Sequence, residues 1–119
     1  MKILLTLKEK PKMTHEQLLA EIKKLKLQET RVDSKEAFEF VIRQGELNQV
    51  CGILEGFFGR AFKSAGEAPT KEAWDYTANI GGIRENQILY YVKHEGISYC
   101  AMIWPWSNRV SVTVKIFQL

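Results

Sequence analysis

Apolar and polar side chains alternate strictly in residues 109–116, and this pattern limits the fold more than any other feature of the chain. β-branched residues at a period of two are typical of a β-strand that buries one face. Residues 109–119 are therefore predicted to form a strand. Valine or isoleucine occupies every second position and polar residues lie between: Val110, Val112, Val114 and Ile116 alternate with Arg109, Ser111, Thr113 and Lys115.

Two further strands are predicted directly upstream, in residues 87–94 and 97–104. Residues 94–96 suit a short glycine-containing turn between them, and residues 105–108, which begin with a proline, suit a second turn. The three strands predict an antiparallel meander with residues 97–104 in the middle. Because this middle strand is apolar on both faces, its second face is predicted to be covered by a helix of the chain or by a second subunit.

Two amphipathic helices are predicted ahead of the meander. Thr14 and Gln17 have the spacing of a capping box, and the apolar stripe that follows them predicts a helix over residues 16–27. Apolar residues at intervals of three and four predict a second, more buried helix over residues 46–62.

Four shorter segments remain. Residues 71–79 are predicted to form a short helix with a threonine as its N-cap and a glycine pair at its end. Residues 36–43 fit either a strand or a helix, and the strand is favoured because one phenylalanine would lie on the polar side of a helix. Residues 28–34 are polar and predicted to be irregular. Residues 2–8 alternate, which predicts an added strand or an ordered arm.

The predicted fold class is α+β, with an antiparallel sheet that contains a C-terminal three-stranded meander and packs against two or three helices. A chain of 119 residues buries a core without disulfides, so one domain is predicted over residues 1–119. Residues 1–7 are too short for the apolar part of a signal peptide, and no apolar run approaches the ~20 residues of a membrane span. Cys51 and Cys100 lie in apolar patterns, so both are predicted to be free thiols of a cytoplasmic protein.

The net charge of +3 comes from residues 1–30, where seven lysines outnumber four glutamates. So small a surplus predicts a solvated helix face. Tyr90, Tyr91, Tyr99 and the tryptophans of the predicted sheet are residues of the type that stacks nucleic-acid bases. Because few basic residues accompany these aromatic residues, nucleic-acid binding ranks below the other functions considered.

Gly52, Gly56 and Gly59 fall on one stripe of the predicted helix over residues 46–62. Each glycine inside a helix costs about 0.5–1 kcal/mol relative to alanine, so the stripe calls for an explanation. Close packing against another element is the favoured explanation, and Gly59 is also placed to end the helix. The alternative is that a ligand approaches the backbone here.

Arg60, Lys63 and Arg84 each lie near glycines in predicted turns. Guanidinium groups and free backbone amides together form binding sites for anions. These three residues are therefore the candidate ligand-binding site, and an anionic small molecule is the ligand that they suit. The simpler alternative is that they are solvated charges that favour the negative ends of helix dipoles.

Trp104, Pro105 and Trp106 form the candidate interaction surface, at the predicted hairpin between the last two strands. Tryptophan is enriched among the residues that dominate the energy of protein interfaces. The alternative is that Trp104 fills the end of the core and Trp106 lies over the sheet.

No catalytic or metal-binding arrangement is apparent, so no catalytic residue, metal site or cofactor is predicted. An enzyme would require His94 or Cys100 to lie in a cleft beside a charged partner. The sequence instead favours a non-enzymatic protein-interaction or adaptor module that binds a protein partner or forms a homodimer. The alternative is a domain that binds an anionic metabolite.

Overall fold

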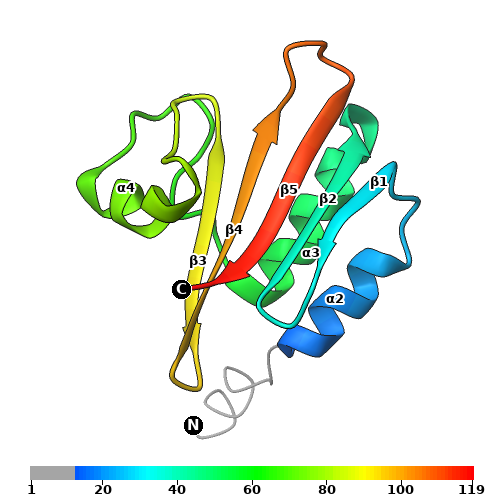
Figure 1. Ribbon diagram of the computed structural model, residues 1–119, viewed down its shortest axis with the longest axis horizontal. Coiled ribbons are helices and arrows are strands. Elements are labelled where there is room, and N and C mark those ends of the chain that lie inside the picture. The colour runs from blue at the N-terminus through cyan, green and yellow to red at the C-terminus, as the bar shows by residue number, and fades with distance from the viewer. Residues whose placement is uncertain (1–12) are drawn as a thin grey trace, which may run out of the picture.

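The computed structural model describes residues 13–119, which contain three α-helices and five β-strands. The strand or arm predicted at residues 2–8 lies outside this range. Figure 1 labels the α-helices and strands, and two 3₁₀ turns complete the elements. In chain order they are α2 (His15–Lys23), β1 (Glu29–Asp33), β2 (Ala37–Arg43), η1 (Gln44–Glu46), α3 (Leu47–Phe58), α4 (Lys71–Thr77), η2 (Ala78–Ile80), β3 (Ile88–His94), β4 (Ile97–Pro105) and β5 (Ser111–Gln118).

The five strands form one antiparallel sheet in the order β1-β2-β5-β4-β3. The predicted C-terminal meander is confirmed, with β4 between β3 and β5. The ambiguous residues 36–43 form strand β2, which pairs with β5 from Ala37↔Phe117 to Arg43↔Ser111. The strand with the strict alternation therefore lies at the centre of the sheet rather than at its edge.

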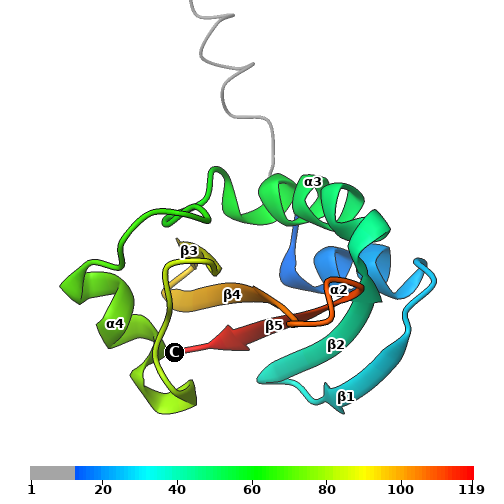
Figure 2. The same cartoon turned by 90° about the horizontal axis from the view of Figure 1, so that it is seen from above.

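Helices α2 and α3 cover one face of the sheet, which we call the first face (Figure 2). They pack there because the apolar stripe of each helix meets the apolar positions of the alternating strands. The main core lies in this layer. Its largest fully buried side chains include Phe38, Phe40, Phe57, Leu54 and Tyr90.

Helix α4 lies by the β3 end of the sheet, and its residues pack on the opposite face, which we call the second face (Figures 1 and 2). Ala73 of this helix is fully buried with Cys100 and Met102 of the middle strand. A helix of the same chain therefore covers the second face of β4, which is one of the two predicted alternatives. Over β5, β2 and β1 this face carries polar side chains, among them Glu39 and Lys115, and no described helix lies over it.

The largest differences from the sequence prediction lie in residues 28–34 and at the ends of two helices. Residues 28–34 were predicted to be irregular, but Glu29–Asp33 forms the edge strand β1. This strand has no fully buried residue and a register shift between Thr30 and Val32, so its sequence carries no stripe of buried apolar residues. Helix α2 ends at Lys23 instead of residue 27, and α3 ends at Phe58 instead of residue 62 because Gly59 ends the helix.

Close packing, the favoured explanation of the glycine stripe, does not explain Gly52. A Cβ atom at Gly52 or at Gly59 would meet no atom within 4 Å, and one at Gly56 would lie 3.3 Å from the Cε atom of Met13. Gly52 lies on the exposed side of the helix, where its conformational freedom destabilises the helix and no packing contact requires a glycine.

The predicted capping box at the start of α2 is confirmed. The backbone N–H of Gln17 donates to Oγ1 of Thr14 at 3.1 Å, and the backbone N–H of Thr14 donates to Oε1 of Gln17 at 2.9 Å. The cap places His15 in the first turn, where its ring stacks on Tyr99 at a centroid distance of 4.7 Å. The rings of His15 and His94 both lie beside the ring of Phe57, with centroid distances of 6.1 and 5.9 Å.

Acid is expected to destabilise the fold through His15. Burial lowers the pKa of its imidazole below the ordinary value of 6.5, although Glu16 opposes this shift. The folded state therefore binds fewer protons than the unfolded state, and stability falls as the pH drops through 6.5 toward the lowered pKa. In urea titrations at pH 7.5 and pH 5, His15→Phe, which keeps the stacked ring without a titratable group, should lose less stability than the wild type. Equal losses in the two proteins would contradict this assignment.

Candidate interaction surface

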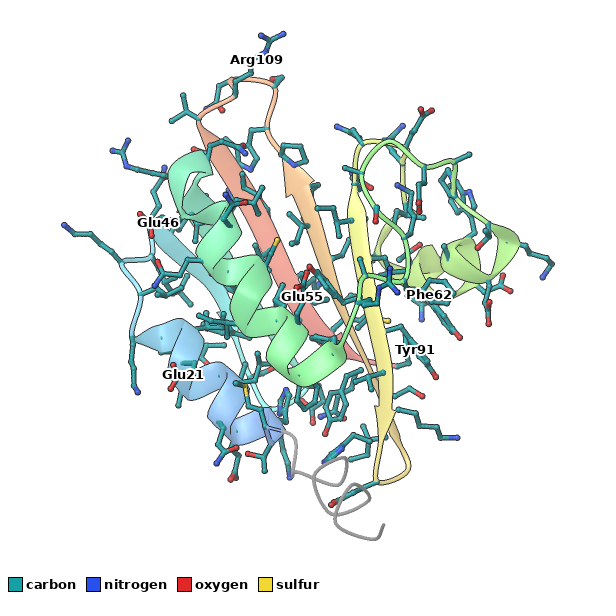
Figure 3. The ribbon with its side chains drawn as sticks, turned by 180° about the vertical axis from the view of Figure 1, so that it is seen from behind. Glu21, Glu46, Glu55, Phe62, Tyr91 and Arg109 are labelled. Carbon is teal, nitrogen blue, oxygen red and sulfur yellow. The ribbon has the colours of Figure 1, made fainter. Side chains whose placement is uncertain are left out.

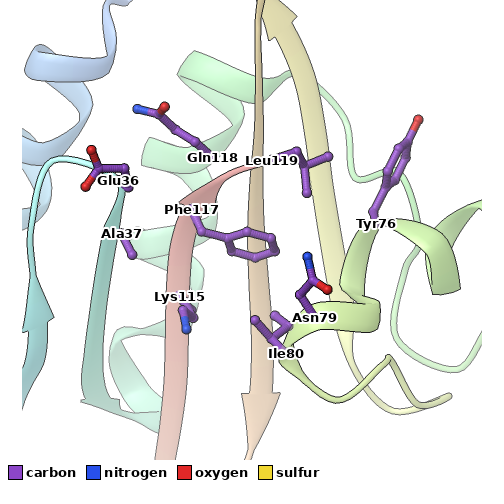
Figure 4. Close-up of a pocket in the computed structure, with 9 residues that line it drawn as sticks. All are labelled: Glu36, Ala37, Tyr76, Asn79, Ile80, Lys115, Phe117, Gln118 and Leu119. Atoms are coloured by element: carbon purple, nitrogen blue, oxygen red, sulfur yellow. The ribbon is translucent and has the colours of Figure 1, made fainter.

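The end of β5 and the turn η2 enclose a pocket of about 330 Å³ on the second face of the sheet. Figure 4 shows the phenyl ring of Phe117 at its centre, with Asn79 and Ile80 reaching toward it from η2 and Lys115 beside it. The hydroxyl of Tyr76 points away from the pocket. We call this the Phe117 pocket; the residues that complete its lining are Glu36, Ala37, Gln118 and Leu119.

A second pocket, of about 310 Å³, also borders η2, and Ile80 lines both. It brings together Arg84 from the predicted anion site and Trp104 from the predicted interaction surface. No salt bridge in the described part of the chain includes Arg84. We call this the Arg84 pocket; its other lining residues are Gly81, Gly82, Gln87 and Met102.

The local sequence determines where η2 lies between these pockets. Thr70 caps α4 as predicted, since its hydroxyl accepts the backbone N–H of Ala73 at 3.1 Å. The chain leaves η2 through Gly81, which has a φ of 100°. Gly82 follows with its Cα against the Trp74 ring, because a Cβ there would lie 1.9 Å from an atom of that ring. This contact ties the loop after η2 back onto α4.

Trp106 does not share the Arg84 pocket with Trp104. Its indole Nε1–H donates to the hydroxyl of Thr113 at 2.7 Å, and the guanidinium of Arg31 lies over its ring at 5.3 Å. Trp106 therefore folds back over the sheet, as the alternative prediction had it, while Pro105 is exposed. Of the three residues predicted as an interaction surface, Trp104 is the one that lines a pocket.

Lys63, predicted to bind an anion, holds a loop together. Its side chain is buried, and its Nζ donates to the backbone carbonyls of Ser64, Glu85 and Gln87 at 2.9, 2.8 and 2.6 Å. An ammonium group has three protons to donate, and these three carbonyls use them all. Lys63 could bind an anion only by releasing one of these carbonyls.

Arg60, the third residue of the predicted anion site, is exposed in the loop that follows α3. It does not line either pocket beside η2. The structure thus assigns Arg84 to a pocket, Lys63 to the loop and Arg60 to the surface.

A short row of charges lies on the second face next to the Phe117 pocket. Glu39 on β2 lies between two cations. Its Oε1 is 3.7 Å from Nζ of Lys115 on β5, and its Oε2 is 3.8 Å from Nη1 of Arg31 on β1. Both contacts are partly exposed, so each contributes little to stability. These charges make the surface beside the apolar ring of Phe117 polar.

Phe62, Tyr76 and Tyr91 form an aromatic cluster that the sequence did not reveal. Tyr76 and Tyr91 stack with ring centroids 4.4 Å apart and an angle of 2° between the rings, and Phe62 and Tyr76 meet in an edge-to-face arrangement with ring centroids 5.5 Å apart. Three separate elements supply these rings. The positions of these residues in the sequence therefore do not predict the cluster.

Cys100 and His94, the two residues that an enzyme would require in a cleft, lie in different surroundings. Cys100 is fully buried, and burial raises the pKa of its thiol to about 12, so the thiolate is disfavoured at neutral pH. His94 lies in an exposed hairpin, where its Nε2 is 3.8 Å from Oε2 of Glu95. Tyr90 and Tyr99 are buried on the first face, where they are not presented to a nucleic acid.

Residues 13–119 contain no group of three or more metal-ligating side chains. Nor does that part of the chain have a helix of the length and apolarity needed to cross a bilayer. The chain matches no family model, no curated protein and no solved structure.

Proposed function

We propose that this protein is a non-enzymatic interaction domain that binds a segment of a protein partner across η2, through the Arg84 and Phe117 pockets. The observation that carries the proposal is the pairing of Arg84 and Trp104 in one pocket, with Met102 beside them. Arginine, tryptophan and methionine are enriched at protein interfaces, and the first two at the positions that dominate the binding energy.

The two pockets suit the side chains of a peptide. Each has a volume of about 300 Å³, at the lower limit of small-molecule sites. They adjoin at Ile80, so one extended segment would fill both. A carboxylate of that segment would pair with Arg84, and an apolar side chain would rest on Phe117. An acidic and apolar peptide is the partner that this chemistry recognises.

Selection from a displayed library of random peptides tests the proposal. The protein is immobilised, and bound peptides are counter-selected against an Arg84→Glu/Trp104→Ala double variant. We expect enriched peptides that carry an acidic residue near an apolar one. Their affinity should fall at least about tenfold for each single variant, as hot-spot residues require. Peptides that bind the wild type and the double variant equally would overturn the proposal.

Arg60→Glu is the control that separates this proposal from the anionic-metabolite alternative. It makes the same charge change at an exposed position outside both pockets. Peptide binding should be unaffected by it. A metabolite bound by Arg60, Lys63 and Arg84 would instead raise the melting temperature of the wild type and lose that effect in Arg60→Glu.

A further inference from the structure

Residues 64–87, which contain α4 and η2, leave the sheet and return to it at one narrow neck. Lys63 precedes the neck and Leu89 follows it, and each donates its backbone N–H to the carbonyl of the other, at 3.1 and 3.0 Å. The ammonium of Lys63 also binds both ends of the segment, through the carbonyls of Ser64 and Gln87. The neck therefore fixes where the segment begins and where it ends.

Hydrogen bonds and packing within the segment hold its parts together. The N–H of Gly66 donates to the carbonyl of Glu85 at 2.8 Å, and the N–H of Gly82 donates to the carbonyl of Thr77 at 2.8 Å. Gly82 also lies against the ring of Trp74, where a Cβ atom would not fit. These contacts join α4, η2 and the loops around them into one unit.

The contact between this unit and the sheet is apolar. Within residues 13–119, no hydrogen bond or salt bridge links the unit to β2, β4 or β5. Its fully buried apolar side chains are the small Ala73 and Ile83, and Tyr76 adds a stack on Tyr91 at 4.4 Å. Parts of a protein that bury few apolar side chains open more readily than its core does.

The seam between the unit and the sheet is also incompletely packed. The Phe117 pocket and the Arg84 pocket both lie along it, with volumes of about 330 and 310 Å³, and Ile80 lines both. Packed protein interiors leave few spaces larger than a water molecule. At the neck, by contrast, the ring centroids of Phe62 and Tyr91 are 6.2 Å apart (Figure 3). The chain is therefore anchored at the neck and loosely packed along the seam.

We propose that residues 64–87 are a lid that opens as one unit about the neck, while the five strands, α2 and α3 stay folded. Opening exposes the apolar second face of β4 and β5, including Cys100 and Met102. It also removes Ile80, the wall that the two pockets share, so the lid controls the shape of both pockets. The opening rests on the contacts of the free chain and not on the proposed function.

Labelling of Cys100 with a thiol reagent tests the opening, because this thiol is fully buried beneath the lid. Cys51→Ala removes the other cysteine. When the lid closes faster than the reagent reacts, the rate reports the population of the open form. We expect Cys100 to react at least about tenfold faster than global unfolding, measured in urea, would allow.

The dependence of this rate on urea supplies a second criterion. A lid exposes much less surface than the unfolded chain, so the rate should rise with urea much less steeply than global unfolding does. Labelling of Cys100 at both the rate and the urea slope of global unfolding would overturn the proposal.

A thiol on the first face is the matched control. Val114 is equally buried but lies in the core beneath α2 and α3, so Val114→Cys in a Cys51→Ala/Cys100→Ala background should react through global unfolding alone. Ile42→Val, in the same core, should speed that reaction by about twofold to tenfold and leave the labelling of Cys100 unchanged. Equal acceleration of both thiols would contradict a lid that opens by itself.

Discussion

Replacement of Lys63 by methionine is expected to lower the free energy of unfolding by about 3 kcal/mol, or the melting temperature by about 10 °C for a domain of this size. The change leaves the carbonyls of Ser64, Glu85 and Gln87 without their shared donor. Hydrogen bonds to a charged group contribute about 1.5–3 kcal/mol each. Burial of the ammonium offsets part of this contribution, because it lowers the pKa of Lys63.

Chemical denaturation of matched lysine variants checks this expectation. Lys71→Met makes the same substitution at a side chain that is 89% exposed, and it should change stability by less than about 0.5 kcal/mol. Lys63→Arg keeps the charge, but its planar donors do not reach three carbonyls in the same way, so it should recover only part of the loss. If Lys63→Met were as stable as Lys71→Met, the assignment of Lys63 as the residue that holds the loop would be wrong.

Gly82→Ala is expected to destabilise the protein by about 2–3 kcal/mol, through backbone strain and a clash. The backbone of Gly82 has a φ of 82°, a left-handed conformation that costs alanine free energy. The added Cβ would also lie 1.9 Å from the Trp74 ring, so the half-exposed indole must rotate away. The fluorescence of the protein should change together with its stability.

Two companion variants separate strain from clash. Gly81 also has a positive φ, of 100°, but a Cβ added there would meet no atom within 4 Å. Gly81→Ala should therefore lower the free energy of unfolding by only about 1 kcal/mol. In a Trp74→Ala background the clash is removed, and Gly82→Ala should then cost about as much as Gly81→Ala. A cost that is unchanged by Trp74→Ala would show that the indole does not restrict this position.

The first face of the fold was predictable because periodicity reports burial. Val112, Val114 and Ile116 alternate, and they are buried as expected. The amphipathic stripes located α2 and α3, although not their ends. Strand β1 left no such signal, because an exposed edge strand buries no side chain in full. Its position follows from pairing with β2, which only the folded chain shows.

The pockets were harder to predict, because their residues come from separate parts of the chain. Arg84 and Trp104 were both singled out, but in different candidate sites, and tertiary packing brings them together. One signal was present for Phe117. It occupies the polar side of the alternation in residues 109–116, extended by one residue, and an aromatic side chain there indicates that the second face becomes covered. For Lys63 the sequence contains no such signal, because a lysine that is buried and bonded to carbonyls has the same residue type as one that is solvated.

The position of β5 at the centre of the sheet affects how the chain folds. Ala37 pairs with Phe117 and Arg43 with Ser111, so the partner of strand β2 lies 68 to 80 residues further along the chain. Loops of this length close slowly, and proteins rich in such contacts fold slowly. During synthesis β1, β2, α2 and α3 leave the ribosome before the strand that joins them to the meander. Their apolar faces are exposed for that interval, and the protein completes its core only after β5 has emerged.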